Sequence, residues 1–446
     1  GNESQERMGL VLKKKDSELM KKVADRERAP YYEVGRITGD HKFTFHRKDA
    51  VVNPIDLDLT DFFGKPPKTI LEDHASPHRF GFMKYDAGKI TEYLEAVLQL
   101  EAVACKDWLT NKVDRSVTGK VALQQCAGEI QLPLNNAGIT ALDYQGIKGV
   151  ATAIGHAPVA GLLDPAKGSV LSAAEALTNI VWAPIDNGLK GVSLSANWMW
   201  PARNKGENAR LYKAVEALSK FAIKTGINIP TGKDSLSMTQ KYPDGEKVYA
   251  PGTVIISAAG EVTNIRKAVK PVLAKDTDTD IIYVSFSGSG FELGGSSFSQ
   301  VINMPGTTPP DVPDPEYFKT AFDAIQELIK DELILAGHDI SAGGLITTLL
   351  EMNFANTEGG LSVNLNRMDV DDPVKLLFSE KPGVVIQTHK ETDVAALLQS
   401  KGIQAGVIGT VVPERVLRID HLMHAMEFDI DSLRDLWFKT SYLFEK

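Results

Sequence analysis

Apolar positions along the chain change their spacing several times, and each change predicts a different kind of element. Three segments carry apolar side chains at helical spacing: 90–109, 172–183 and 207–226. Gly226 ends the last of them and is a plausible helix C-cap. Extended runs at 117–125 and 250–262 lie between these helices. The middle of the chain is therefore predicted to be an α+β region with a sheet.

The C-terminal part alternates strand-like and helix-like segments after a break at Pro271. Strand-like runs occupy 281–287, 382–388 and 405–412, and helix-like runs occupy 315–332, 343–355 and 391–402. Such alternation is typical of α/β domains. The fold class expected for the whole chain is thus α/β and α+β.

Residues 1–80 differ from both of these regions. They hold three short β-like runs, at 8–14, 31–37 and 42–47, followed by a turn-rich segment in which Pro66–Pro67 predicts a linker. The first residues are polar, lack an initiator methionine and resemble no signal peptide. We therefore expect the chain to be a fragment of a longer protein.

Composition narrows the class of protein. Hydrophobic residues make up 43% and charged residues 24% of the chain, as in ordinary soluble proteins. A net charge of −9 argues against nucleic-acid binding. No apolar run approaches the length of a membrane span. Cys105 and Cys126 are the only cysteines in the sequence. A disulfide framework is therefore not expected, and we expect a cytoplasmic location.

Two polar clusters carry candidate chemistry. Glu175 and Asn179 are four residues apart and lie on one face of a predicted helix, where their oxygens could bind Mg²⁺. The alternative is that they form an exposed polar pair, or that Asn179 is a local helix cap. Asp339 and Ser341 precede a helix next to Gly343–Gly344, where a phosphate could bind through a metal. The alternative is an ordinary helix cap.

Two further segments are rich in glycine and serine. "NIPTGKDSLSM", residues 228–238, is not a Walker loop, because Ile227 stands where that motif needs glycine and Asp234 follows Lys233. Lys233 and Ser235 could contact phosphate or close a turn. The segment 288–301 offers similar donors and is weak evidence alone, since such loops are common.

The order of the motifs is more specific than any single one. They are "DRERAPYYEVGRITGDHKFTF", "PIDLDLTDFFGKPPK", "DRSVTGKVALQQCAG", "GLLDPAKGSVLSAAEALTN", "SANWMW", "PTGKDSLSM", "LGGSSFSQ" and "GHDISAGGLITTLLEMNFA". Together they closely resemble the large, single-chain form of the phosphoribosylformylglycinamidine synthase (formylglycinamide ribonucleotide amidotransferase) family. The resemblance covers essentially the whole chain.

The resemblance implies a domain plan. Such enzymes contain two aminoimidazole-ribonucleotide-synthetase-like units, each an A domain plus a B domain, followed by a glutaminase domain. Residues 1–80 then correspond to the end of the first B domain with a linker, 81–268 to the second A domain and 269–446 to the second B domain. The A domain is expected to form a barrel with a partner A domain.

The resemblance also implies an activity. The family is a carbon–nitrogen ligase that uses ATP and glutamine to convert formylglycinamide ribonucleotide to formylglycinamidine ribonucleotide in purine synthesis. The half corresponding to this chain is expected to hold an auxiliary nucleotide, ATP or ADP, with Mg²⁺. We expect the fragment alone to be inactive, because its partners, the first A/B half and the glutaminase domain, are missing. It is expected to self-associate through the A domain.

Site residues follow from the same resemblance. The metal ligands fall on Asn136, Glu175, Asn179 and Asp339, and the nucleotide contacts on Asn135, Lys233, Ser235 and Ser341. No catalytic residue is assigned. Asn136 stands where the family has aspartate, and Ala342 stands within a motif that commonly reads "SDGG". Asn136 predicts weaker Mg²⁺ binding, since Asn keeps an oxygen but removes a charge. Together the two departures bring into question whether the auxiliary site is filled.

Two alternatives stay open. The chain could be a nucleotide-binding or packing half without catalysis of its own. It could also be a free-standing member of the same superfamily, such as a selenophosphate synthetase or a thiamine-phosphate kinase. A free-standing member needs its own glycine-rich element before the A domain, and residues 1–80 do not resemble one.

Overall fold

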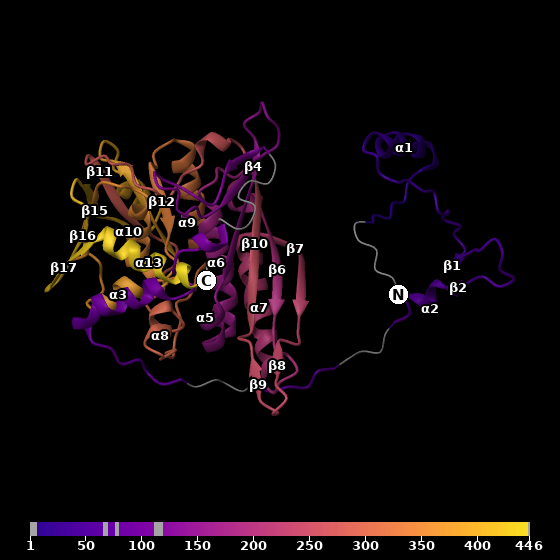
Figure 1. Ribbon diagram of the computed structural model, residues 1–446, viewed down its shortest axis with the longest axis horizontal. Coiled ribbons are helices and arrows are strands. Elements are labelled where there is room, and N and C mark those ends of the chain that lie inside the picture. The colour runs from indigo at the N-terminus through magenta and orange to yellow at the C-terminus, as the bar shows by residue number, and fades with distance from the viewer. Residues whose placement is uncertain (1–6, 66–69, 76–79, 111–118, 445–446) are drawn as a thin grey trace. The chain divides into compact units, whose positions relative to one another are not determined.

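The N-terminal part of the computed structural model forms a small unit of its own (Figure 1). The structure describes residues 7–65, 70–75, 80–110 and 119–444, and the chain divides into units 1–71 and 72–446. The linker expected at Pro66–Pro67 lies outside the described residues. The elements of the first unit are η1 (Lys14–Asp16), α1 (Ser17–Arg26), β1 (Lys42–Phe45), β2 (Ile55–Asp58) and α2 (Leu59–Phe62).

Residues 7–65 bury little apolar surface. Ala24 is the only buried residue in this range. Of the three β-like runs, only 42–45 forms a strand, which pairs antiparallel with β2. The runs at 8–14 and 31–37 are not strands, and those expectations are wrong. A strand needs a paired neighbour and a covered face, and neither run has them in this part of the structure.

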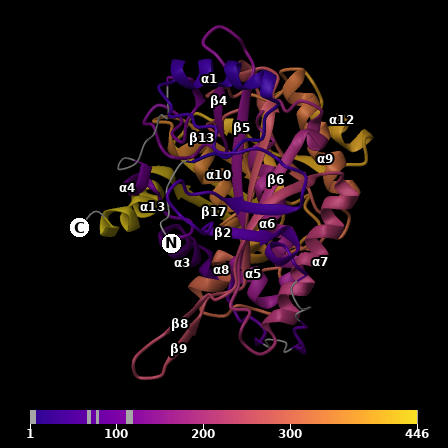
Figure 2. The same cartoon turned by 90° about the vertical axis from the view of Figure 1, so that its right-hand side faces the viewer.

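The second unit contains a six-stranded sheet in the order β3-β4-β5-β10-β6-β7. Only β6 and β7 are parallel, and the sheet is open, with β3 and β7 as its edges. Its strands are β3 (Val121–Leu123), β4 (Gly138–Ala141), β5 (Gly149–His156), β6 (Val192–Met199), β7 (Asn228–Ser235) and β10 (Thr253–Val262). A hairpin of β8 (Thr239–Lys241) and β9 (Lys247–Tyr249) projects from it (Figure 2).

Helices cover one face of this sheet (Figure 1). They are α5 (Pro158–Leu163), α6 (Pro165–Ile180) and α7 (Glu207–Thr225). Gly226 caps α7 in the left-handed conformation, as predicted. On the opposite face, the side chains of Val150, Thr152, Ile154 and His156 of β5 are exposed.

Helix α6 begins and packs for clear local reasons. The Asp164 side chain accepts hydrogen bonds from the backbone of Ala166 and Lys167, and Pro165 occupies the first turn. Gly155 of β5 lies against the helix, where a Cβ would approach Ser172 O to 2.3 Å. The missing side chain lets α6 pack closely on β5, which brings the polar face of the helix to the end of that strand.

A second sheet of seven strands has the order β12-β14-β11-β15-β13-β16-β17. Its strands are β11 (Thr279–Ser285), β12 (Ala336–Asp339), β13 (Gly360–Asn364), β14 (Gly383–His389), β15 (Ala405–Val412), β16 (Val416–His421) and β17 (His424–Asp429). All neighbours are antiparallel except β13 and β16. The alternation in sequence therefore predicted the element types correctly, although the sheet that the strands form is mostly antiparallel.

Helices from both ends of the second unit pack around this sheet (Figures 1 and 2). Helix α3 lies against α13, although they are far apart in sequence. The helices are α3 (Ile90–Gln99), α4 (Asp107–Thr110), α8 (Ser297–Val301), α9 (Pro315–Lys330), α10 (Gly344–Phe354), α11 (Pro373–Phe378), α12 (Val394–Ser400) and α13 (Ile430–Phe444), with 3₁₀ turns η2 (Ala87–Lys89), η3 (Gly188–Gly191) and η4 (Ile265–Lys267).

The two sheets share one hydrophobic cluster. Leu177 of α6 and Ile256 of β10 belong to the same buried cluster as Phe322 of α9. Trp182 is 2% exposed and packs on Gly337 of β12, where a Cβ would lie 2.0 Å from the indole ring. This contact fixes β12 of the second sheet against the segment that follows α6. The two polar clusters predicted from the sequence lie on these elements.

Candidate functional site

Helix α6 presents two polar side chains to the end of β5. The Glu175 carboxylate accepts a 2.6 Å hydrogen bond from the His156 backbone N–H. The Asn179 amide donates a 3.3 Å hydrogen bond to the Ile154 carbonyl. Both side chains therefore lie on the same face of α6, as their spacing predicted. They contact the strand and are not a freely exposed pair.

Asp339 ends β12 and is 2% exposed. Its Oδ1 lies 3.0 Å from His338 Nδ1, and His338 Nε2 lies 3.3 Å from a Glu351 oxygen. Burial lowers the pKa of His338, but the hydrogen bond and the two carboxylate charges outweigh it and raise the pKa to about 9. Asp339 Oδ2 is buried without a hydrogen-bond partner among the described residues. One oxygen of this carboxylate is thus held, and the other is available to a ligand.

Glu380 is a third carboxylate in this neighbourhood, and the sequence did not reveal it. It accepts hydrogen bonds from the backbone N–H groups of Ser297 (2.7 Å) and Gly343 (2.9 Å). Burial raises its pKa. The only signal in the sequence is a glutamate three residues before a buried strand, in "SEKPG", and many exposed glutamates occupy such positions.

The electrostatics show that these carboxylates influence one another. Burial, together with the negative charges of Asp339 and Glu380, raises the pKa of Glu175 to about 8, and the hydrogen bond from the His156 N–H opposes this shift. Such mutual repulsion disfavours the charged form of the site. A bound cation would relieve it.

Asn135 and Asn136 lie in the segment just before β4, the strand that neighbours β5 in the sheet. Asn135 donates to the carbonyls of Gln124 and Cys126 at 2.7 and 3.0 Å, and its Oδ1 is buried without a partner. Asn136 Nδ2 is likewise buried and unpaired within the described chain. Gly138 pairs with Thr152 of β5. Asn136 therefore lies two residues before the first residue of β4 that pairs with β5.

The alternative interpretation, an ordinary side-chain cap before α10, is wrong. The residue at the N-cap of α10 is Gly343, in the left-handed conformation and without a side-chain cap. Asp339 belongs to β12. Ser341 follows in the connecting loop, where its carbonyl accepts from Gly344 N–H at 3.0 Å. Backbone turn geometry, not a side chain, thus shapes this connection, and the Asp339 side chain is left to the site.

The segment 228–235 is a strand, not the turn expected from its glycine and lysine. It forms the edge strand β7, and Lys233 Nζ donates to Ser235 Oγ. The register places Lys233 opposite Asn197 of β6, Asn197 opposite Ile255 of β10, and Ile255 opposite His156 of β5. Lys233 and Ser235 therefore lie across the sheet from the Glu175 side of β5, and the structure does not bring them to the carboxylates.

The donor set suits a hard cation completed by a ligand. Mg²⁺ in nucleotide sites is typically bound by one or two carboxylates together with phosphate oxygens. Asp339 Oδ2 and Glu175 can supply two such oxygens, and Asn179 an amide oxygen. Within the described ranges, no cluster of three or more His, Cys, Asp or Glu side chains is arranged to hold a metal alone. The residues fit a cation that arrives with a nucleotide.

Comparison with protein families identifies the two sheets. The family described as "FGAR-AT PurM_N-like domain" matches residues 105–261, and that described as "AIR synthase related protein, C-terminal domain" matches residues 280–421. The first match spans the six-stranded sheet and the second most of the seven-stranded sheet. The second unit thus combines the two domain types of proteins related to aminoimidazole ribonucleotide synthetase.

Full-length relatives give the particular family. Phosphoribosylformylglycinamidine synthase of Homo sapiens is 37% identical over 471 residues, which cover 100% of this chain and 35% of the human protein. The probable phosphoribosylformylglycinamidine synthase of Arabidopsis thaliana, chloroplastic/mitochondrial, is 36% identical over 100% of this chain and 33% of its own length. The chain belongs to the phosphoribosylformylglycinamidine synthase family and spans about a third of the length of these curated relatives.

Solved structures confirm the fold. Thermotoga maritima PurL complexed with FGAR matches with a TM-score of 0.61 and 17% identity, over 77% of this chain and 53% of that one. The same protein complexed with ADP matches with a TM-score of 0.56 and 17% identity, over 84% and 53%. The expected fold class is confirmed. Among residues 7–444 as described, no helix is long and apolar enough to span a membrane.

Proposed function

We propose that the chain forms one half of the synthetase part of an ATP-dependent ligase that converts formylglycinamide ribonucleotide, glutamine and ATP to formylglycinamidine ribonucleotide, glutamate, ADP and phosphate. The names of the curated relatives support this activity. Because those relatives are about three times as long as this chain, the first synthetase-like half and the glutaminase domain would come from outside it. Without them the 446-residue chain is expected to be inactive.

The site at Glu175 and Asp339 would bind Mg²⁺ with ATP or ADP. The observation that supports this most directly is the buried, unpaired Oδ2 of Asp339 close to a Glu175 whose pKa is raised. T. maritima PurL has been solved in complexes with ATP, AMPPCP and ADP. A bound cation would supply charge neutralisation of the nucleotide phosphates.

Each of the predicted site residues has a defined part in this proposal. Asp339 offers Oδ2 while His338 holds Oδ1. Glu175 is held by the His156 N–H, and Asn179 by the Ile154 carbonyl. Asn136 would contribute an amide in place of a carboxylate, which lowers the charge available to the cation. Asn135 and Ser341 would face the nucleotide, and Lys233 and Ser235 stay weaker candidates because they lie across the sheet.

Calorimetry with ADP and Mg²⁺ tests the site. Asp339→Asn and Glu175→Gln keep the shape of each side chain and remove its charge, and each is expected to weaken Mg–ADP binding at least about tenfold. Asp371→Asn, at an exposed carboxylate, is the matched control. Binding of Mg–ADP that survives both site variants unchanged would contradict the proposal.

An alternative, a packing half without nucleotide, rests on apolar side chains that are exposed on one face of the six-stranded sheet. Val150 and Ile154 on that face are 38% and 56% exposed. In the longer protein a related sheet would cover this face, and the chain alone is then expected to self-associate. Light scattering tests this part of the proposal. A monodisperse monomer at high concentration would rule out self-association, and Ile154→Lys is expected to reduce it.

A further inference from the structure

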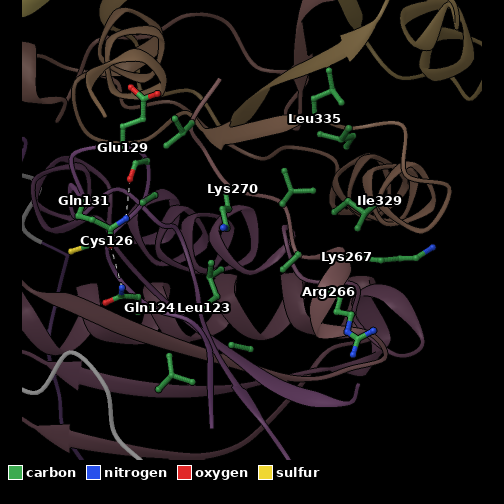
Figure 3. Close-up of a pocket in the computed structure, with 18 of the residues that line it drawn as sticks. Leu123, Gln124, Cys126, Glu129, Gln131, Arg266, Lys267, Lys270, Ile329 and Leu335 are labelled. Carbon is green, nitrogen blue, oxygen red and sulfur yellow. Dashed lines mark hydrogen bonds between the residues drawn. The ribbon is translucent and has the colours of Figure 1, made fainter. Parts of the chain in front are cut away.

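An open pocket of about 990 Å³ lies at the end of β12 that is opposite to Asp339. One wall is formed by β3 and the loop after it, with Leu123, Gln124 and Gln131. The facing wall is formed by Ile329 near the end of α9 and by Leu335, which directly precedes β12. Figure 3 shows Lys270 between the two walls. The pocket is therefore separate from the site at Asp339, although both adjoin the same strand.

Three basic side chains line this pocket, and one of them is neutralised. Lys267 Nζ lies 3.4 Å from Glu332 and donates to the Lys330 carbonyl at 2.8 Å. Figure 3 shows its amine directed away from Lys270. Lys270 and Arg266 are exposed and form no ion pair with any described residue. Two positive charges are thus left to the pocket.

The acidic side chains of the pocket do not offset these two charges. Glu332 is committed to Lys267. Glu129 is 2.8 Å from Lys275 and accepts from the backbone and the hydroxyl of Thr357. The chain as a whole carries a net charge of −9. The positive charge of Arg266 and Lys270 in this pocket is therefore opposite in sign to the charge of the whole chain. It favours an anionic ligand.

The rest of the lining defines the size and nature of that ligand. Val121, Leu123 and Ile334 provide apolar surface beside the cations, and Gln124 and Asn356 provide amide groups. Strand β3 is also a sheet edge, which leaves backbone groups for hydrogen bonds. We propose that this pocket binds a phosphate monoester of about the size of a nucleoside monophosphate, with its phosphate on Arg266 and Lys270 and its organic part against the apolar wall. Arg266 can bind a phosphate through two parallel N–H groups.

Calorimetry with AMP in the presence of EDTA tests this pocket, because removing Mg²⁺ separates it from the metal-dependent site. AMP is expected to bind the 446-residue chain more tightly than inorganic phosphate does, and adenosine is expected not to bind. The double variant Arg266→Gln/Lys270→Gln should lower AMP affinity at least about tenfold. Lys247→Gln, at an exposed lysine of the β8–β9 hairpin, and Asp339→Asn should each leave it within about twofold.

Three outcomes would overturn the proposal. One is no heat of AMP binding at a ligand concentration of about 5 mM, where even a weak complex would form. Another is equal binding by the double variant and the unchanged chain. A third is loss of AMP binding in Asp339→Asn but not in the double variant, which would place AMP in the carboxylate site. Because Arg266 and Lys270 are exposed, their replacement is expected to leave the fold intact, and circular dichroism verifies that.

Discussion

The two ends of strand β12 differ in the sign of their charge and in its exposure. At one end the buried Asp339 lies within electrostatic reach of Glu175. At the other end Arg266 and Lys270 are exposed in an open pocket. Burial makes charged carboxylates costly at the acidic end, so a cation that neutralises them is held strongly. At the basic end, solvent and salt screen the charges and weaken the binding of an anion. The same strand therefore positions two sites of very different electrostatic strength.

The largest predicted effect comes from the contact that holds β12 in place. Trp182→Ala removes a buried indole from against Gly337 and is expected to cost about 3–5 kcal/mol of unfolding free energy. Both binding events should weaken together, because both sites depend on the position of β12. Urea unfolding measures the stability. Trp108→Ala, at a partly exposed tryptophan stacked on Phe444, is the control and should cost clearly less.

A comparison of sequence and structure explains which of these features were predictable. The spacing of Glu175 and Asn179 fixes them on one helix face, because helix geometry is local. The closeness of Glu175 to Asp339 depends on how the two sheets pack. In the sequence, only the family resemblance indicated that these two residues share a site. Glu380 and the Arg266–Lys270 pocket come from loops whose tertiary positions leave no periodic signal. The strand at 228–235 was mistaken for a turn because its parallel pairing with β6 overrides the preference of glycine for turns.

A second prediction concerns a buried amine beside the acidic end. Lys381 is 5% exposed, and its Nζ lies 4.5 Å from the centre of the Phe291 ring. Burial lowers its pKa to about 8 from 10.5. Between those values the unfolded chain binds more protons than the folded one, so this lysine makes stability rise with pH. Lys381→Met should remove a rise of about 2–3 kcal/mol between pH 7.5 and 10.5.

The measurement for Lys381 is a difference between two unfolding curves at each pH. Burial also raises the pKa of the Cys105 thiol to about 12, which makes stability fall above pH 9 in both proteins, and the subtraction removes that common effect. Lys224→Met, at an exposed lysine in the last turn of α7, is the control. A pH dependence identical in the Lys381 variant and the unchanged chain would show that the amine is solvated in solution.

Salt separates the two ends of β12 more directly. Raising NaCl from about 50 to about 500 mM shortens the screening length to a few ångströms. AMP binding in the pocket is expected to fall about tenfold, because Arg266 and Lys270 are exposed. Mg–ADP binding at Asp339 should fall much less, because its carboxylate is buried. Titrations of both ligands at three salt concentrations test this, and equal slopes would mean that exposure does not distinguish the two sites.

The smallest predicted effect concerns only the pocket at the basic end of β12. Glu129→Gln keeps an acceptor for Thr357 but removes the charge that pairs with Lys275 at 2.8 Å. Lys275 then adds to the positive field of the pocket, and AMP should bind about two- to threefold more tightly at low salt. Glu358→Gln is the matched control, because Glu358 is farther from the same amine, at 3.6 Å, and 80% exposed. Equal gains in the two variants would mean that AMP responds to net charge in general, whereas a gain only in Glu129→Gln places its phosphate within reach of this pocket.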